Sequence, residues 1–200
     1  MNKLIKKTAL ITIATLIAAA LTVFGLWIAI SPQTMATACE KTGNYSFAVT
    51  CAGLRYNRTK GTEDLARCAE YGILSGKDKH ILNYCYLLVQ DENYEVLCEK
   101  RNEEISSGKG GSVLDKYLGS VNYDGYIKSH LCAAQYRAGN LEESLSTLET
   151  DESGDSLIKL VLAISEKSDK AAAERLLEFL EDYEQNTFIK EISQILKGIN

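Results

Sequence analysis

Proline and histidine are scarce in this 200-residue chain, and the familiar signatures of catalysis are missing. The one proline is Pro32, which suits a mostly helical chain because proline breaks helix interiors. The six cysteines form no Cys-x-x-Cys pair, and His80 and His130 lie far from any ligand-like spacing. No phosphate-binding loop, Gly-x-Ser-x-Gly elbow or dinucleotide fingerprint occurs. We therefore expect no enzyme activity, no cofactor and no metal site.

The chain also lacks a surplus of positive charge. Its formal net charge is -5, and residues 140–200 hold 14 acidic but only 6 basic residues. Residues 32–139 are balanced, with 13 of each sign. Phosphate backbones and anionic lipids attract basic proteins, so this balance argues against nucleic acid and against a second contact with anionic lipid. A solvated helix surface is the simplest explanation of the acidic C-terminal third.

A long uncharged segment follows a short basic head at residues 1–7. The segment runs for 23 residues from Thr8 to Ile30, which as a helix covers a bilayer of roughly 30 Å. Trp27 near its far end fits the interfacial aromatic belt. The head carries three lysines, namely Lys3, Lys6 and Lys7. By the positive-inside rule we predict a single-pass signal-anchor at 8–30 in the cell membrane, with a cytoplasmic N-terminus and an extracytoplasmic C-terminal domain.

Two other fates of this segment stay open. The small residues Ala36-Thr37-Ala38 resemble a signal-peptide cleavage site, and Cys39 after them would carry the lipid of a lipoprotein. The apolar part of a signal peptide is usually about 7–15 residues, however, and this one is longer. Pro32 and Gln33 also separate the apolar segment from the cleavage site. The anchor is the preferred interpretation.

Turn residues recur at a nearly constant interval in residues 32–200. The turns centre on Gly43, Gly76, Gly108, Gly139 and Ser168, which are 33, 32, 31 and 29 residues apart. Glycine ends helices in the left-handed conformation, and Asn or Asp after it can cap the next helix. Intervals of this length are typical of stacked helical hairpins. We predict an all-α domain over 32–200 whose regularity fails near 106–126.

Small or apolar residues recur at fixed offsets from these turns. Seven residues before each regular turn and five after it, the chain places Ala36, Ala69, Cys132 and Val161, then Ala48, Ile81, Ser144 and Ala173. Such residues allow paired helices to approach closely. Further along each second helix, apolar residues continue at helical spacing: Leu54 and Tyr56, Leu87 and Leu88, Leu145 and Leu148, and Leu176, Leu177 and Leu180.

The segments Glu40–Ala48 and Arg137–Leu145 resemble the turn and second helix of the tetratricopeptide repeat, where Gly, Asn, Tyr and Ala recur. The family's usual Trp and closing Pro are missing, so an α-solenoid of other ancestry stays an alternative. The resemblance implies a solenoid of antiparallel hairpins that binds proteins. Membrane-tethered repeat proteins of this kind serve as scaffolds or as assembly or chaperone-like subunits, and we expect that function here, with a protein partner.

Four cysteines lie at matching distances from successive turns. Equal distance from a turn means equal height in antiparallel helices, so Cys51–Cys68 and Cys85–Cys98 are candidate disulfides if the domain is exported. The alternative is that these thiols are small apolar residues at close helix contacts. Height alone does not decide between the two, because bonding also needs Cα atoms within about 7 Å.

Tyrosine is abundant, with eleven residues, and clusters in the first half of the chain. A solenoid groove rich in tyrosine is a plausible protein-binding surface. The candidate groove-lining residues are Tyr45, Tyr56, Tyr84 and Tyr86. The alternative function is a self-associating structural protein of the cell envelope, a homo-oligomer built through solenoid ends or through the anchor. The small residues Ala18–Ala20 and Gly25 would allow anchor helices to pair closely.

Overall fold

The protein is all-helical, as the sequence predicts. The computed structural model describes residues 2–107, 122–183 and 186–199, and no strand occurs among them. The eleven helices in these residues are α1 (Asn2–Ile30), α2 (Pro32–Lys41), α3 (Tyr45–Thr59), α4 (Thr62–Leu74), α5 (Asp78–Val89), α6 (Tyr94–Ser106), α8 (Tyr123–Arg137), α9 (Leu141–Glu149), α10 (Asp155–Lys167), α11 (Lys170–Glu181) and α12 (Thr187–Lys197).

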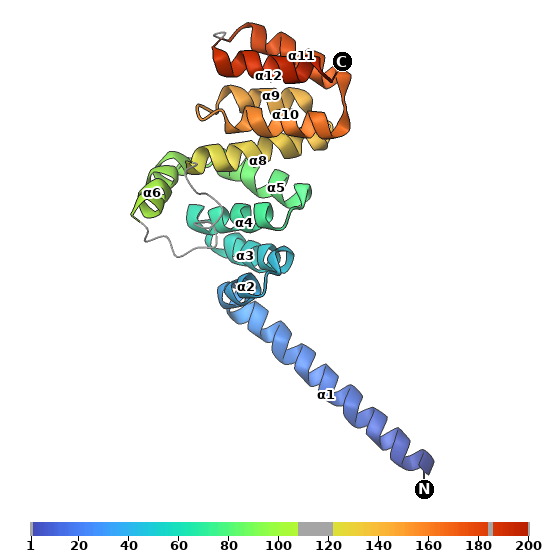
Figure 1. Ribbon diagram of the computed structural model, residues 1–200. Helices are drawn as coiled ribbons and strands as arrows, with labels where there is room; N and C mark the ends of the chain where they lie inside the picture. Colours follow the sequence, from blue (N-terminus) through green and yellow to red (C-terminus); the bar gives the residue numbers. More distant parts are fainter. Residues whose placement is uncertain (1, 108–121, 184–185, 200) are drawn as a thin grey trace.

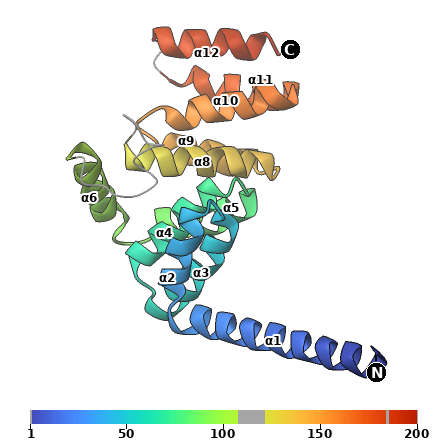
Figure 2. The ribbon, with the colours of Figure 1, turned by 60° about the horizontal axis from the view of Figure 1, so that its bottom comes forward.

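Helix α1 projects from one end of a stack formed by the other helices (Figures 1 and 2). Its segment Lys7–Ile30 has 24 residues, and no part of its most apolar stretch is buried in the protein. By length and composition this helix can cross a membrane, although a signal sequence near an N-terminus passes the same test.

The predicted turns join the two helices of each hairpin. Gly43, Gly76 and Gly139 have φ of 72°, 65° and 91°, and Ser168 has φ of 49°. They lie between α2 and α3, α4 and α5, α8 and α9, and α10 and α11. Glycine adopts this left-handed conformation without the steric cost that Ser168 incurs. Gly108 lies outside the described residues, as does most of the stretch 106–126 that we predicted to be irregular.

The residues at fixed offsets from these turns are all buried. Cys132 and Ser144 show why small size matters: the hydroxyl of Ser144 donates to the Cys132 carbonyl at 2.9 Å, which requires α8 and α9 to approach closely. The eight are exposed by at most 3%: Ala36, Ala48, Ala69, Ile81, Cys132, Ser144, Val161 and Ala173. The sequence pattern therefore marks the contacts within and between hairpins.

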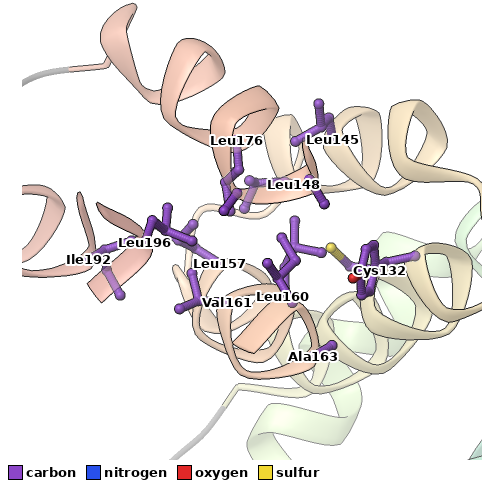
Figure 3. Close-up of a cluster of buried hydrophobic side chains, with 14 of the residues drawn as sticks. Cys132, Leu145, Leu148, Leu157, Leu160, Val161, Ala163, Leu176, Ile192 and Leu196 are labelled. Carbon is purple, nitrogen blue, oxygen red and sulfur yellow. The ribbon is translucent and has the colours of Figure 1, made fainter. Parts of the chain in front are cut away.

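Three clusters of buried side chains follow one another along the stack. In the C-terminal cluster, Leu145 and Leu148 of α9 meet Leu176 of α11, and Leu160 of α10 lies toward Cys132 of α8 (Figure 3). Burial of each large aliphatic side chain stabilises the fold by roughly 1.5–3 kcal/mol. The core of the repeat domain therefore consists of three successive clusters.

The stack departs from a regular solenoid at α6, which lies to its side (Figure 1). Helix α8 packs directly on α5, the place that the helix of the next regular hairpin would take. A buried polar network connects α4, α6 and α8 at this point. The Tyr123 hydroxyl donates to Glu70 of α4 at 2.9 Å, and Arg101 Nε of α6 lies 3.5 Å from the same carboxylate oxygen. Asn102 of α6 accepts from the Tyr123 amide at 2.8 Å.

Candidate functional site

A groove of about 590 Å³ runs across α4, α8 and α10 of the repeat domain. An adjoining hollow of about 300 Å³ shares Ile73, His130, Lys159 and Leu162 with it and extends to Arg137. The groove is lined mainly by apolar side chains, which are Tyr45, Ile73, Leu74, Tyr126, Ile158 and Leu162.

Helix α10 supplies the exposed apolar part of this groove. Ile158 and Leu162 lie one turn apart and are 42% and 57% exposed. Leu157, Leu160 and Val161 on the same helix are buried in the core. A helix with apolar residues on more than one side normally has each of these sides buried against other parts of a protein or a membrane. The second apolar side of α10 is instead open to the groove.

The polar part of the groove consists of Ser129, Asp155 and a lysine beside a neutral histidine. Lys159 Nζ lies 2.9 Å from His130 Nε2, and the Tyr126 ring contacts His130 edge-on with centroids 4.9 Å apart. Burial, with the charges of Lys159 and Arg137, lowers the pKa of His130 to about 3. Neutral His130 can therefore accept a hydrogen bond from Lys159, whose own pKa burial lowers.

Arg137 at the groove's end is already paired. Its Nε and Nη2 bind the Asp78 carboxylate of α5 at 2.9 and 2.6 Å. This bidentate pair fixes the end of α8 to the start of α5. Lys159, by contrast, makes no ion pair within residues 2–107, 122–183 and 186–199. The groove thus combines open aliphatic surface with an ammonium group that a partner can reach.

The four predicted groove tyrosines lie in different places. Tyr45 lines the groove, whereas Tyr56 and Tyr84 are partly buried against the hydrophobic clusters of α3, α4 and α5. Tyr86 is 46% exposed on α5 and does not line the groove. Sequence reasoning missed the groove residues of α10, although its run Leu157–Leu162, apolar on more than one side, was a usable signal.

All six cysteines are buried and free, so neither candidate disulfide is bonded in this structure. Cys51 and Cys68 share one hydrophobic cluster, and Cys85 and Cys98 share the next. Burial is the main cause that raises the pKa of Cys51 and of Cys98 to about 11, and that of Cys68 to about 12. Protonated buried thiols react slowly, since the thiolate is the nucleophile.

These thiols lead to a direct prediction for the full-length protein purified in detergent without reductant. We expect iodoacetamide to modify none of the six cysteines rapidly in the native state, and all six after denaturation, by intact mass. The expected difference follows from burial and protonation. Only two modified thiols after denaturation would instead show two disulfides, the number that the pairs Cys51–Cys68 and Cys85–Cys98 require.

The comparisons with known proteins add no family. Neither the protein-family models, nor the curated proteins, nor the solved structures give a match to the chain. The hairpin stack is compatible with a helical repeat fold, and the likeness to the tetratricopeptide repeat stays a resemblance. Among the described residues, no group of His, Cys, Asp and Glu side chains is placed to hold a metal ion.

Proposed function

We propose that the protein is a membrane-anchored scaffold or assembly subunit that binds another protein through the groove of α4, α8 and α10. The observation that carries this proposal is the open apolar side of α10, where Ile158 and Leu162 are exposed beside Lys159. Aliphatic side chains next to a charge suit a partner segment with apolar side chains and a carboxylate. No chemical step is required of the protein in this function.

The anchor gives the scaffold its place. In this proposal α1 stays uncleaved as a single-pass helix, its basic head lies in the cytoplasm, and the helical stack lies outside. Tethering confines the groove to a thin layer at the membrane surface. Such confinement raises the effective concentration for partners in the same membrane without any further contact.

A charge in the groove tests this proposal. The full-length protein and its Leu162→Glu variant are each purified from detergent-solubilised membranes of the native source, and co-purifying proteins are quantified by mass spectrometry. We expect the partner to fall at least tenfold in the variant, because burying a carboxylate against apolar surface costs more than about 1.4 kcal/mol.

The matched control is Val96→Glu on α6, since Val96 is 66% exposed but lies outside the groove. It adds the same charge and should retain the partner fully. Equal recovery of every partner with both variants would contradict binding through the groove.

Self-association is the second candidate function, and one feature of α12 favours it. Phe188 and Ile195 lie two turns apart on this last helix and are 39% and 52% exposed. Exposed apolar side chains that share one face of a helix suit contact with another apolar surface. Recovery of the protein with copies of itself alone, abolished by Ile195→Glu and unaffected by Leu162→Glu, would support a homo-oligomer built through α12.

A further inference from the structure

The end of the membrane helix contacts the repeat domain through two side chains. The ring of Phe24 in α1 stacks on Phe47 in the first turn of α3, with centroids 6.1 Å apart and planes inclined by 12°. One turn later, Ile28 packs against the cluster that contains Met35 and Ala36 of α2. The repeat domain is therefore held at a defined height relative to α1.

That height places specific residues at the membrane surface. The 24 residues of Lys7–Ile30 extend for about 36 Å, whereas the hydrocarbon layer is roughly 30 Å thick. With Lys7 at the cytoplasmic boundary, the hydrocarbon ends near Trp27. The residues that follow, up to about Ser31, then lie in the layer of lipid headgroups, which is roughly 5–7 Å thick on each side.

A cleft of about 230 Å³ opens at this level, between the α1–α2 junction and the last turn of α3. Ile30, Ser31 and Thr34 line one side, and Arg55 and Arg58 line the other. The hydroxyls of Ser31 and Thr34 are hydrogen-bonded at 2.5 Å, so both are fixed at the start of α2. The cleft thus combines the apolar side chains of Ile30 and Pro32 with a polar, basic lining.

The two arginines differ in their partners. Arg55 Nε lies 2.7 Å from Asp64, and the same carboxylate accepts from Thr59. Arg58 is exposed and makes no ion pair within the described part of the chain. The cleft therefore carries a positive charge that no carboxylate of the described residues neutralises. Guanidinium groups bind phosphate oxygens in a bidentate manner.

We propose that this cleft binds the phosphate of a phospholipid from the leaflet facing the repeat domain, with Arg58 as its main ligand. The acyl chains would extend toward the stacked rings of Phe24 and Phe47. A stripe on the same side of α3 supports this orientation: Leu54, one turn before Arg58, is 38% exposed. The acidic net charge of the protein argues against a contact with anionic lipid. That acidic charge, however, resides in residues 140–200, at the distant C-terminal end of the stack.

This inference rests on the membrane-spanning part of the proposed function, and native mass spectrometry of the full chain in dodecyl maltoside tests it. The probe is dioleoyl phosphatidylglycerol, added in equal amounts to each variant. We expect one bound lipid per chain in the natural protein and at least a fivefold weaker affinity in Arg58→Gln. Arg58→Lys should be intermediate, because lysine keeps the charge but loses the fork of donors.

The matched control is Arg175→Gln, which removes the same charge from an exposed arginine on α11 and should bind the lipid normally. Equal lipid binding by Arg58→Gln and the natural protein would overturn the site. Displacement of the lipid by inorganic phosphate at the same concentration would overturn the lipid assignment and indicate a soluble phosphate. Leu162→Glu, the groove variant, should bind the lipid normally, so that failure of either proposal can be recognised separately.

Discussion

Leu88→Ala is expected to destabilise the repeat domain by about 2–5 kcal/mol. Leu88 is fully buried in the cluster that α4, α5, α6 and α8 share. Truncation removes its contacts and leaves a cavity that the surrounding helices fill only in part. Because α8 packs directly on α5, the loss lies where the two halves of the stack meet. The measurement is urea unfolding of the full-length protein in micelles, followed by circular dichroism at 222 nm.

The neighbouring residue provides a matched control. Leu87 is 40% exposed on the same helix, so Leu87→Ala loses little buried surface and should change the free energy of unfolding by less than about 1 kcal/mol. Similar losses in both variants would show that the packing of α5 differs from the structure. A loss in Leu88→Ala confined to one unfolding step would show that the stack unfolds in two parts.

The leucine pair also shows what the sequence could and could not predict. Turns depend on local signals, so Gly43, Gly76, Gly139 and Ser168 could be located from the sequence alone, and all four adopt positive φ. Small residues at fixed offsets are equally local. The predicted apolar stripe of the second helices was wrong at two positions, because Leu54 and Leu87 are 38% and 40% exposed. Their neighbours Tyr56 and Leu88 take the inward positions.

The position of α6 beside the stack could not be predicted, because the polar contacts at this point join residues that are far apart in the sequence. Glu70 and Tyr123 are 53 residues apart, and a glutamate in an amphipathic helix normally indicates solvent. Only the fold shows that Glu70 is 5% exposed and lies between Tyr123 and Arg101. The groove was missed for a similar reason, since Lys159 and His130 meet across 29 residues and two helices. Periodicity identifies the elements of such a stack, whereas long-range polar pairs decide where it departs from regularity.

The buried Glu70 gives the second large prediction, which concerns pH. Burial raises the pKa of Glu70 to about 7, although Arg101 and the hydrogen bond from Tyr123 act in the opposite direction. The unfolded chain has the ordinary value of 4.5. Between these two values the folded protein holds a proton that the unfolded chain has released. This contribution to stability is therefore complete below about pH 4.5 and is lost as the pH rises to about 7, a loss of roughly 1–3 kcal/mol.

The readout is the difference between the natural protein and Glu70→Gln in urea unfolding at several pH values from 5 to 8. The stability of the natural protein must be compared with that of the variant at each pH, because neutral, buried His130 has the opposite effect. It makes the folded protein more stable as the pH rises up to the ordinary histidine pKa of 6.5. Glutamine keeps an oxygen that can accept from Tyr123 but cannot ionise. We expect Glu70→Gln to gain stability relative to the natural protein as the pH rises, by the same 1–3 kcal/mol.

Glu63→Gln is the matched control for this difference, because Glu63 also binds Arg101. Burial raises the pKa of Glu63, but the hydrogen bond with Lys100 and the charge of Arg101 outweigh it, so the net shift is downward. Its contribution is present above pH 4.5 and is lost only at lower pH, so Glu63→Gln should follow the natural protein's slope from pH 5 to 8. A difference between Glu70→Gln and the natural protein that stays constant from pH 5 to 8 would mean that Glu70 is ionised in the folded protein throughout this range. The network would then be a buried ion pair with Arg101 and not a hydrogen-bonded neutral acid.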